Sequence, residues 1–266
     1  MNFVTSKDGT RIAYTATGKG PAIILVNGAT AFPALDPTLP ALTEMLKDDF
    51  TLVAFDRRGR GQSGDTRPFS PQREIEDIEA LIDQFGGKAT LYGQSSGAVL
   101  SLIAAGKLPG VTHVLAYEPP YSTPGTGNDL PADYVEKLAR YNAENNGDTA
   151  AALFLTGAVG LPEEAVDGMR QGDFWPVMVG VGPTIYYDAV YMTLERDGYE
   201  IPSHLWAGSQ AKFLIVDGGA SFPGMREAAD AVAAATPGAG RKSLGDQGHG
   251  PSAEAIAPVL REFAGR

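Results

Sequence analysis

A serine stands among glycines in the segment Gly93-Gln94-Ser95-Ser96-Gly97, directly after an apolar run and directly before the apolar stretch 98–105. This order predicts a strand, a tight turn and a helix, and a turn this tight requires small residues beside the serine. Its strained backbone would hold the Ser95 hydroxyl at the carboxyl end of the sheet, where open α/β sheets bind ligands. Ser95 is therefore the candidate nucleophile; a glycine-rich turn without chemistry is the alternative.

A serine nucleophile needs a base that takes its proton, and the chain offers three histidines. We expect His113 at the start of its strand, away from Ser95, and His204 where a helical segment returns to the sheet. His249 lies between glycines, after the last expected strand and before the last expected helix, so it emerges at the same sheet edge as Ser95. A surface histidine is the alternative for each, but a glycine-flanked His249 on this loop has little packing reason to exist. The sequence predicts His249 as the general base.

Short apolar runs in the sequence indicate the strands that must position these residues. They predict strands buried on both faces at 22–26, 51–55, 89–92, 111–117 and 212–216. Helical patterns lie between the runs; the side chain of Ser70 can cap one of them, and that of Ser252 can cap the last. Strands that alternate with helices predict a mostly parallel sheet with helices on both faces.

The alternation breaks between residues 121 and 206, where helical patterns follow one another without a convincing strand. We expect a core domain of residues 1–120 and 207–266 and an inserted helical cap, or lid, of residues 121–206. The aromatic rings of the cap either form its own small core or line a substrate pocket. The predicted pocket residues are Asn27, Trp175, Tyr187 and Tyr191.

Composition excludes several classes of protein. Asp and Glu outnumber Lys and Arg by 32 to 21, which argues against nucleic-acid and anionic-membrane partners. With no cysteine there is no disulfide framework, thiolate nucleophile or cysteine-bound zinc. Three scattered histidines do not make a metal site, and no glycine-rich phosphate loop is present, so we expect neither metal nor cofactor. Without a leader or a long apolar run, the expected protein is cytoplasmic, a monomer or homodimer, and acts on a small molecule.

Four features together resemble the α/β-hydrolase fold family. They are the segment 93–97, Asn27-Gly28 after the predicted strand 22–26, the sequence D-R-R-G-R-G-Q-S at 56–63 after the predicted strand 51–55, and the late His249. The resemblance covers nearly the whole chain outside the cap. It implies a mostly parallel α/β-hydrolase sheet flanked by helices, with an inserted helical cap.

The resemblance also implies roles for individual residues. It implies Ser95 as the nucleophile, His249 as the general base, and an oxyanion hole formed by the N–H groups of Ala29 and Ser96. Two such donors, already aimed at the developing oxyanion, are worth a few kcal/mol each. Many members have His-Gly where this chain has Asn27-Gly28, a change that keeps the backbone donor. We interpret the segment 56–63 as structural.

The acid of the triad has two candidates. Most members of the family carry it a few residues past the strand that corresponds to 212–216, at the position of Ala220 in this chain, and Asp217 falls about three residues early. Other members place the acid at the end of the strand that corresponds to 111–117, where this chain has Glu118. An apolar strand that ends in a carboxylate beside the site is hard to explain by solvation, so we favour Glu118 over Asp217. A buried carboxylate facing the histidine would fix its tautomer and stabilise the imidazolium.

The predicted function is that of a serine hydrolase. It would cleave a small or medium, fairly apolar carboxylic ester, lactone or thioester through an acyl-enzyme on Ser95. One alternative is a non-hydrolytic enzyme on the same fold, such as a lyase or perhydrolase, because a fold does not settle a reaction. Another is a catalytically weak ligand-binding receptor, which the alanine at position 220 would suit.

Overall fold

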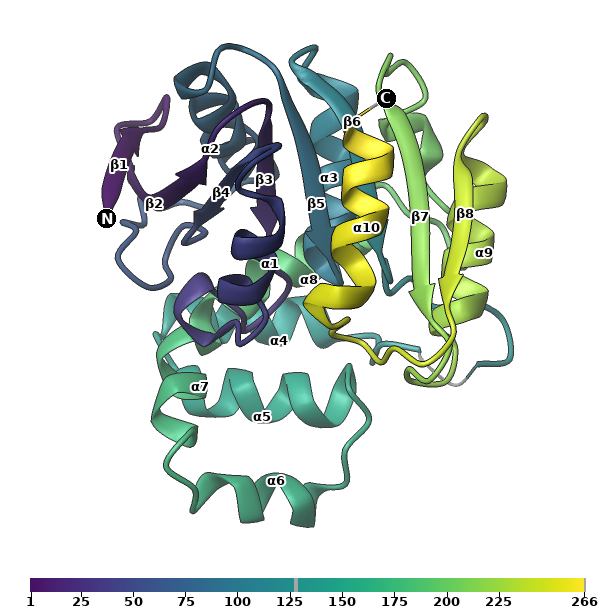
Figure 1. Ribbon diagram of the computed structural model, residues 1–266. Helices are drawn as coiled ribbons and strands as arrows, with labels where there is room; N and C mark the ends of the chain where they lie inside the picture. Colours follow the sequence, from purple (N-terminus) through teal and green to yellow (C-terminus); the bar gives the residue numbers. More distant parts are fainter. Residues whose placement is uncertain (127–128, 266) are drawn as a thin grey trace.

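The computed structural model describes residues 1–126 and 129–265. An eight-stranded sheet runs through its centre in the order β1-β2-β4-β3-β5-β6-β7-β8 (Figure 1). Its first strands, β1 (Asn2–Thr5) and β2 (Arg11–Gly18), are antiparallel to their neighbours. The other strands are parallel: β3 (Ala22–Val26), β4 (Thr51–Phe55), β5 (Ala89–Gln94), β6 (Val111–Tyr117), β7 (Lys212–Gly218) and β8 (Gly240–Leu244). The predicted fold class is confirmed.

Helices cover both faces of the sheet (Figure 1). One face carries α1 (Leu39–Leu46) and α10 (Ala253–Ala264), and the other carries α2 (Pro71–Gln84), α3 (Ser96–Lys107) and α9 (Met225–Ala235). The strand β3 shows why its run of apolar residues is unbroken. Ile23 and Leu25 pack on the first face, whereas Ile24 and Val26 pack on the second, so every side chain of the strand is buried.

The two predicted helix caps have different outcomes. The Ser252 hydroxyl accepts a hydrogen bond from the Ala255 N–H at the start of α10, as predicted. Ser70 occupies the capping position of α2 as predicted, but its side chain makes no capping hydrogen bond. Its backbone has the extended conformation of a capping residue, and Pro71 at the first helical position leaves one N–H fewer to satisfy.

The residues 121–206, here called the inserted segment, leave the sheet after β6 and return before β7. They form α4 (Tyr134–Ala143), α5 (Gly147–Gly157), α6 (Glu163–Arg170), α7 (Trp175–Val181) and α8 (Ile185–Thr193). Most of these helices lie below the sheet in Figure 1 and have small apolar cores of their own, but Tyr191 and Met192 of α8 belong to the main core. The division into a core domain and a cap therefore stays a prediction.

Short 3-10 helices complete the fold at η1 (Pro33–Leu35), η2 (Gly182–Thr184) and η3 (Ser203–Leu205). Across the described residues, every helix is too short or too polar to span a bilayer.

Candidate active site

Ser95 sits at a strained turn between β5 and α3. Its backbone has φ 55° and ψ −129°, a conformation that costs free energy in a residue other than glycine. The glycines around it are required by space. A Cβ on Gly93 would lie 2.5 Å from the Gly97 carbonyl oxygen, and one on Gly97 would lie 2.1 Å from the Val26 carbonyl oxygen. The sequence G-x-S-x-G is thus the one that lets the strand turn directly into the helix.

The loop after β3 packs directly on this serine. A Cβ on Gly28 would lie 2.8 Å from the Cβ of Ser95 and 3.4 Å from its hydroxyl oxygen. The next residue, Ala29, and the residue after the serine, Ser96, are the predicted oxyanion donors. Among the described residues, neither of their N–H groups donates a hydrogen bond to a protein acceptor. Both donors are thus available to a ligand beside Ser95.

His249 is paired with a buried carboxylate. Its Nδ1 lies 2.6 Å from Oε2 of Glu118, a side chain that is 0% exposed. Glu118 also accepts hydrogen bonds from the Gly218 N–H (2.8 Å) and the Ser221 hydroxyl (2.7 Å). With Nδ1–H donating to the carboxylate, Nε2 is the ring atom that can take a proton. Of the two candidate acids, the structure places Glu118 against the histidine.

Two contacts hold the backbone beside His249 at the sheet edge. The Tyr117 hydroxyl donates to the Gly248 carbonyl (2.6 Å), and the Ala220 N–H donates to the Gln247 carbonyl (2.9 Å). Ala220 stands where most α/β hydrolases are expected to carry the acid. In this chain its backbone supports the histidine loop instead.

A family model described as the alpha/beta hydrolase family matches residues 23–262. The chain belongs to this family. An alpha/beta hydrolase from Sphaerobacter thermophilus DSM 20745 has a similar structure over 99% of this chain and 100% of that one, with a TM-score of 0.86 and 40% identity.

Curated relatives of this α/β hydrolase match over shorter stretches. Serine hydrolase BPHL of Homo sapiens is 33% identical over 117 residues, which is 40% of this chain and 38% of that protein. Proline iminopeptidase PfmaB of Pestalotiopsis fici is 27% identical over 99 residues, 35% of each. The match thus spans less than half the length of these relatives, which are themselves hydrolases.

The second candidate acid of the α/β hydrolase faces cations. Asp217, also 0% exposed, lies 2.5 Å from Nη1 of Arg241 and 3.6 Å from Nε of Arg226. It also accepts a hydrogen bond from the Ser243 hydroxyl at 3.1 Å. These partners come from β8 and α9, so Asp217 ties the last strand and its helix to β7.

The other two histidines have partners away from Ser95. The ring of His113 packs edge-on against Phe263 of α10, 5.2 Å between centroids. The Nε2 of exposed His204 lies 2.9 Å from a carboxylate oxygen of Glu195.

The predicted pocket residues are all buried, and each makes a hydrogen bond within the protein. The Asn27 carbonyl accepts a hydrogen bond from Arg57. The other three donate hydrogen bonds within the protein: the Trp175 Nε1–H to Asp148, the Tyr187 hydroxyl to Asp65, and the Tyr191 hydroxyl to the Pro71 carbonyl. Their role in lining a substrate pocket stays a prediction.

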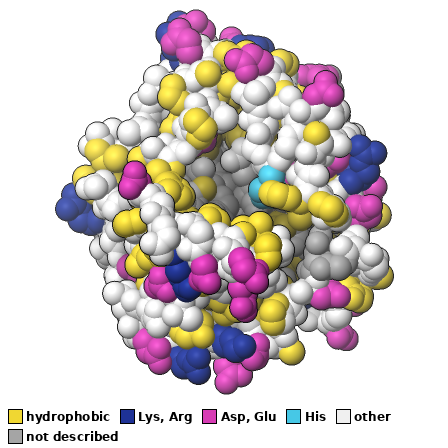
Figure 2. Space-filling model, turned by 90° about the horizontal axis from the view of Figure 1, so that it is seen from below, with side chains coloured by type: hydrophobic (Ala, Val, Ile, Leu, Met, Phe, Trp, Pro, Cys, Tyr) yellow, Lys and Arg dark blue, Asp and Glu magenta, His cyan; other side chains and the backbone are white. Residues whose placement is uncertain are grey.

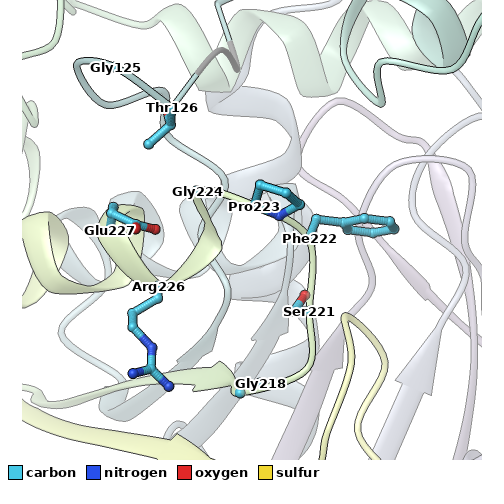
Figure 3. Close-up of a pocket in the computed structure, with 10 residues that line it drawn as sticks. Gly125, Thr126, Gly218, Ser221, Phe222, Pro223, Gly224, Arg226 and Glu227 are labelled. Atoms are coloured by element: carbon cyan, nitrogen blue, oxygen red, sulfur yellow. The ribbon is translucent and has the colours of Figure 1, made fainter.

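The surface around the histidine side of the site is apolar in part. Figure 2 views the molecule from below, where the face is hollowed near its centre and hydrophobic side chains and a histidine stand at the rim. The ring of Phe222 lies 5.5 Å from that of His249 and is 54% exposed. The loop 218–224, with Phe222, also lines a cavity of about 420 Å³. Figure 3 shows the Phe222 ring directed away from Arg226 and Glu227, which line the same cavity.

Sequence reasoning missed one residue in contact with the site. Asp188 of α8 accepts a hydrogen bond from the Ser96 hydroxyl at 2.7 Å, across 92 positions of sequence. Its only signal is an acidic residue within the apolar, aromatic helix I-Y-Y-D-A-V-Y-M-T.

Proposed function

We propose that this α/β hydrolase is a serine hydrolase that cleaves a small or medium, fairly apolar carboxylic ester, lactone or thioester. The observation that carries the proposal is the placement of strained Ser95 at the sheet edge where a glutamate binds His249. The names of the two curated relatives, a serine hydrolase and an iminopeptidase, support an acyl-transfer reaction. Phe222 beside the histidine and the apolar rim in Figure 2 support an apolar substrate.

In the proposed reaction, Nε2 of His249 takes the Ser95 hydroxyl proton as the serine oxygen attacks the substrate carbonyl carbon. The N–H groups of Ala29 and Ser96 bind the resulting oxyanion, and buried Glu118 stabilises the imidazolium. Collapse of the tetrahedral intermediate breaks the bond to the leaving group, which receives the proton from His249. Water, deprotonated by His249, then attacks the acyl-enzyme, and the acid leaves with Ser95 restored.

A fluorophosphonate tests this proposal because it reacts covalently with an activated serine. The intact mass of the wild-type protein should rise by one adduct, and Ser95→Ala should show none. Ser101→Ala is a matched control. The buried Ser101 hydroxyl donates a hydrogen bond to the Gly97 carbonyl within α3, so this variant should still form the adduct. Nitrophenyl esters of increasing acyl length then report turnover. A folded wild-type protein that forms no adduct and turns over no ester would contradict the proposal.

A further inference from the structure

Three arginines of the segment 56–63 are buried behind the nucleophile. Arg57, Arg58 and Arg60 are each 2% exposed or less, and arginine is almost never fully buried unless it is paired. Arg58 pairs with Asp77 and Asp8, and among the described residues its guanidinium makes no hydrogen bond or ion pair with the loop after β3. Arg57 and Arg60 instead contact the loop after β3. A purely structural role for the segment 56–63 does not explain these contacts.

The two arginines bind the backbone that precedes the predicted oxyanion donor. Nη1 of Arg60 donates to the Gly28 carbonyl oxygen at 2.7 Å, and Nη1 of Arg57 donates to the Asn27 carbonyl oxygen at 3.1 Å. The Gly28 C=O and the Ala29 N–H belong to one planar trans peptide unit and point in opposite directions. A guanidinium that holds the Gly28 carbonyl therefore also sets the direction of the Ala29 N–H.

A carboxylate from the inserted segment holds the arginines in turn. Asp188 of α8 binds Nη1 of Arg57 at 2.6 Å, Nη2 of Arg60, and the Ser96 hydroxyl. Burial alone would raise the pKa of Asp188, but Arg57 and Arg60 hold it below its usual value. The Asp188 carboxylate therefore stays charged. It contacts Ser96, one residue that supplies a predicted oxyanion donor, directly, and it reaches the peptide of the other donor, Ala29, through Arg60.

We propose that Arg60 is a positioning residue that aims the Ala29 N–H at the oxyanion, and that Asp188 keeps Arg60 in place. The inserted segment then completes the oxyanion hole through Asp188 of α8. This inference rests on the proposed acyl-transfer function. Because the oxyanion exists only in the transition state and the intermediate, the loss of its donor lowers kcat and leaves KM nearly unchanged.

The test compares two buried arginines of one loop. Arg60→Met should lower kcat by about 10²-fold, the effect of losing one oxyanion donor, with KM changed less than about threefold. Arg58→Met is the matched control, since it also removes a buried, ion-paired guanidinium but none that touches Asn27 or Gly28. It should lower Tm and leave kcat within about threefold of wild type. Equal losses of kcat in the two variants would overturn the proposal.

Crystal structures of the variants give a second measurement that does not need turnover. In Arg60→Met the Gly28–Ala29 peptide unit should turn, and in Arg58→Met it should keep its direction. An unturned peptide in Arg60→Met overturns the inference whatever the kinetics. Should Arg60→Met fail to fold, Arg60→Met with Asp188→Asn removes both charges together and tests the same peptide. A wild-type protein without fluorophosphonate adduct contradicts the proposed function, whereas an active wild type with an unturned peptide contradicts only this inference.

Discussion

The neighbouring strands β6 and β7 each have, at their carboxyl ends, a carboxylate that is 0% exposed, yet the two carboxylates face different kinds of partner. Glu118, just after β6, accepts hydrogen bonds from an imidazole, a hydroxyl and a backbone N–H. Asp217, within β7, faces the guanidinium groups of Arg241 and Arg226. A carboxylate paired with arginine holds elements together, whereas one that binds an imidazole can stabilise the charge which that ring acquires during the reaction. Burial alone therefore does not identify the acid; its partner does.

The largest expected effect separates the two carboxylates by activity. Glu118→Gln should lower kcat/KM by about 10³- to 10⁴-fold, because the amide cannot stabilise the imidazolium or hold its tautomer. Asp217→Asn should stay within about threefold of wild type, since Asp217 contacts no proposed catalytic group. Steady-state hydrolysis of a nitrophenyl ester measures both. Equal losses in the two variants would remove the distinction.

The pairing of Asp217 with arginine should matter for stability rather than for activity. Arg241→Met removes the nearer of the two arginines that face Asp217, and we expect the free energy of unfolding to fall by about 2 kcal/mol. This is less than for a fully buried pair, because the Arg241 side chain is 24% exposed. Urea unfolding measures the change, with kcat/KM of the variant as the control. A loss below about 0.5 kcal/mol, typical of an exposed ion pair, would show that Asp217 does not need this cation.

A matched pair of serines sharpens the comparison. Ser221 donates to Glu118 at 2.7 Å, and Ser243 donates to Asp217 at 3.1 Å. Ser221→Ala removes one of the groups that orient Glu118, so kcat should fall by about fivefold, a change of ~1 kcal/mol. Ser243→Ala should leave kcat unchanged. If both variants kept wild-type kcat, the Ser221 hydroxyl would have no part in orienting the acid.

A third carboxylate, Asp8, extends the comparison to pH. Burial alone would raise its pKa, but hydrogen bonds from Thr10 and Arg58 lower the pKa of Asp8 to about 2. A depressed pKa stabilises the fold above the ordinary value of 3.8, and the contribution is lost as the pH falls toward 2. Asp8→Asn should thus cost about 1 kcal/mol at pH 7, and the difference from wild type should shrink below pH of about 4. A difference that stays constant between pH 7 and 3 would contradict this assignment.

The sequence carried the local signals of the fold well. The runs 22–26, 51–55 and 111–117 are strands with those bounds, and most of their residues are apolar and buried. The turn at Ser95 could also be predicted from the sequence. Its glycines are required because a Cβ at either position would clash with nearby backbone. Such features depend on neighbours in the chain.

What the sequence could not predict depends on partners far along the chain. Glu118 meets His249 across 131 positions, whereas Asp217 meets cations of β8 and α9, and the apolar strand before each carboxylate is similar. The arginines of the segment 56–63 would by composition be solvent-exposed, but Glu74, Asp77 and Asp188 from two helices allow their burial. Pairing of this kind becomes visible only when the helices are in place.

The rate at which a fluorophosphonate labels Ser95 tests the central claim most directly, because it reports the nucleophile before any substrate is known. Intact mass should be followed over time for the wild type, Glu118→Gln and Asp217→Asn. We expect one adduct on Ser95 in the wild type and in Asp217→Asn at rates within about threefold, and labelling slowed at least about a hundredfold in Glu118→Gln. Fast labelling of Glu118→Gln, with slow labelling of Asp217→Asn, would contradict the account and make Asp217 the acid.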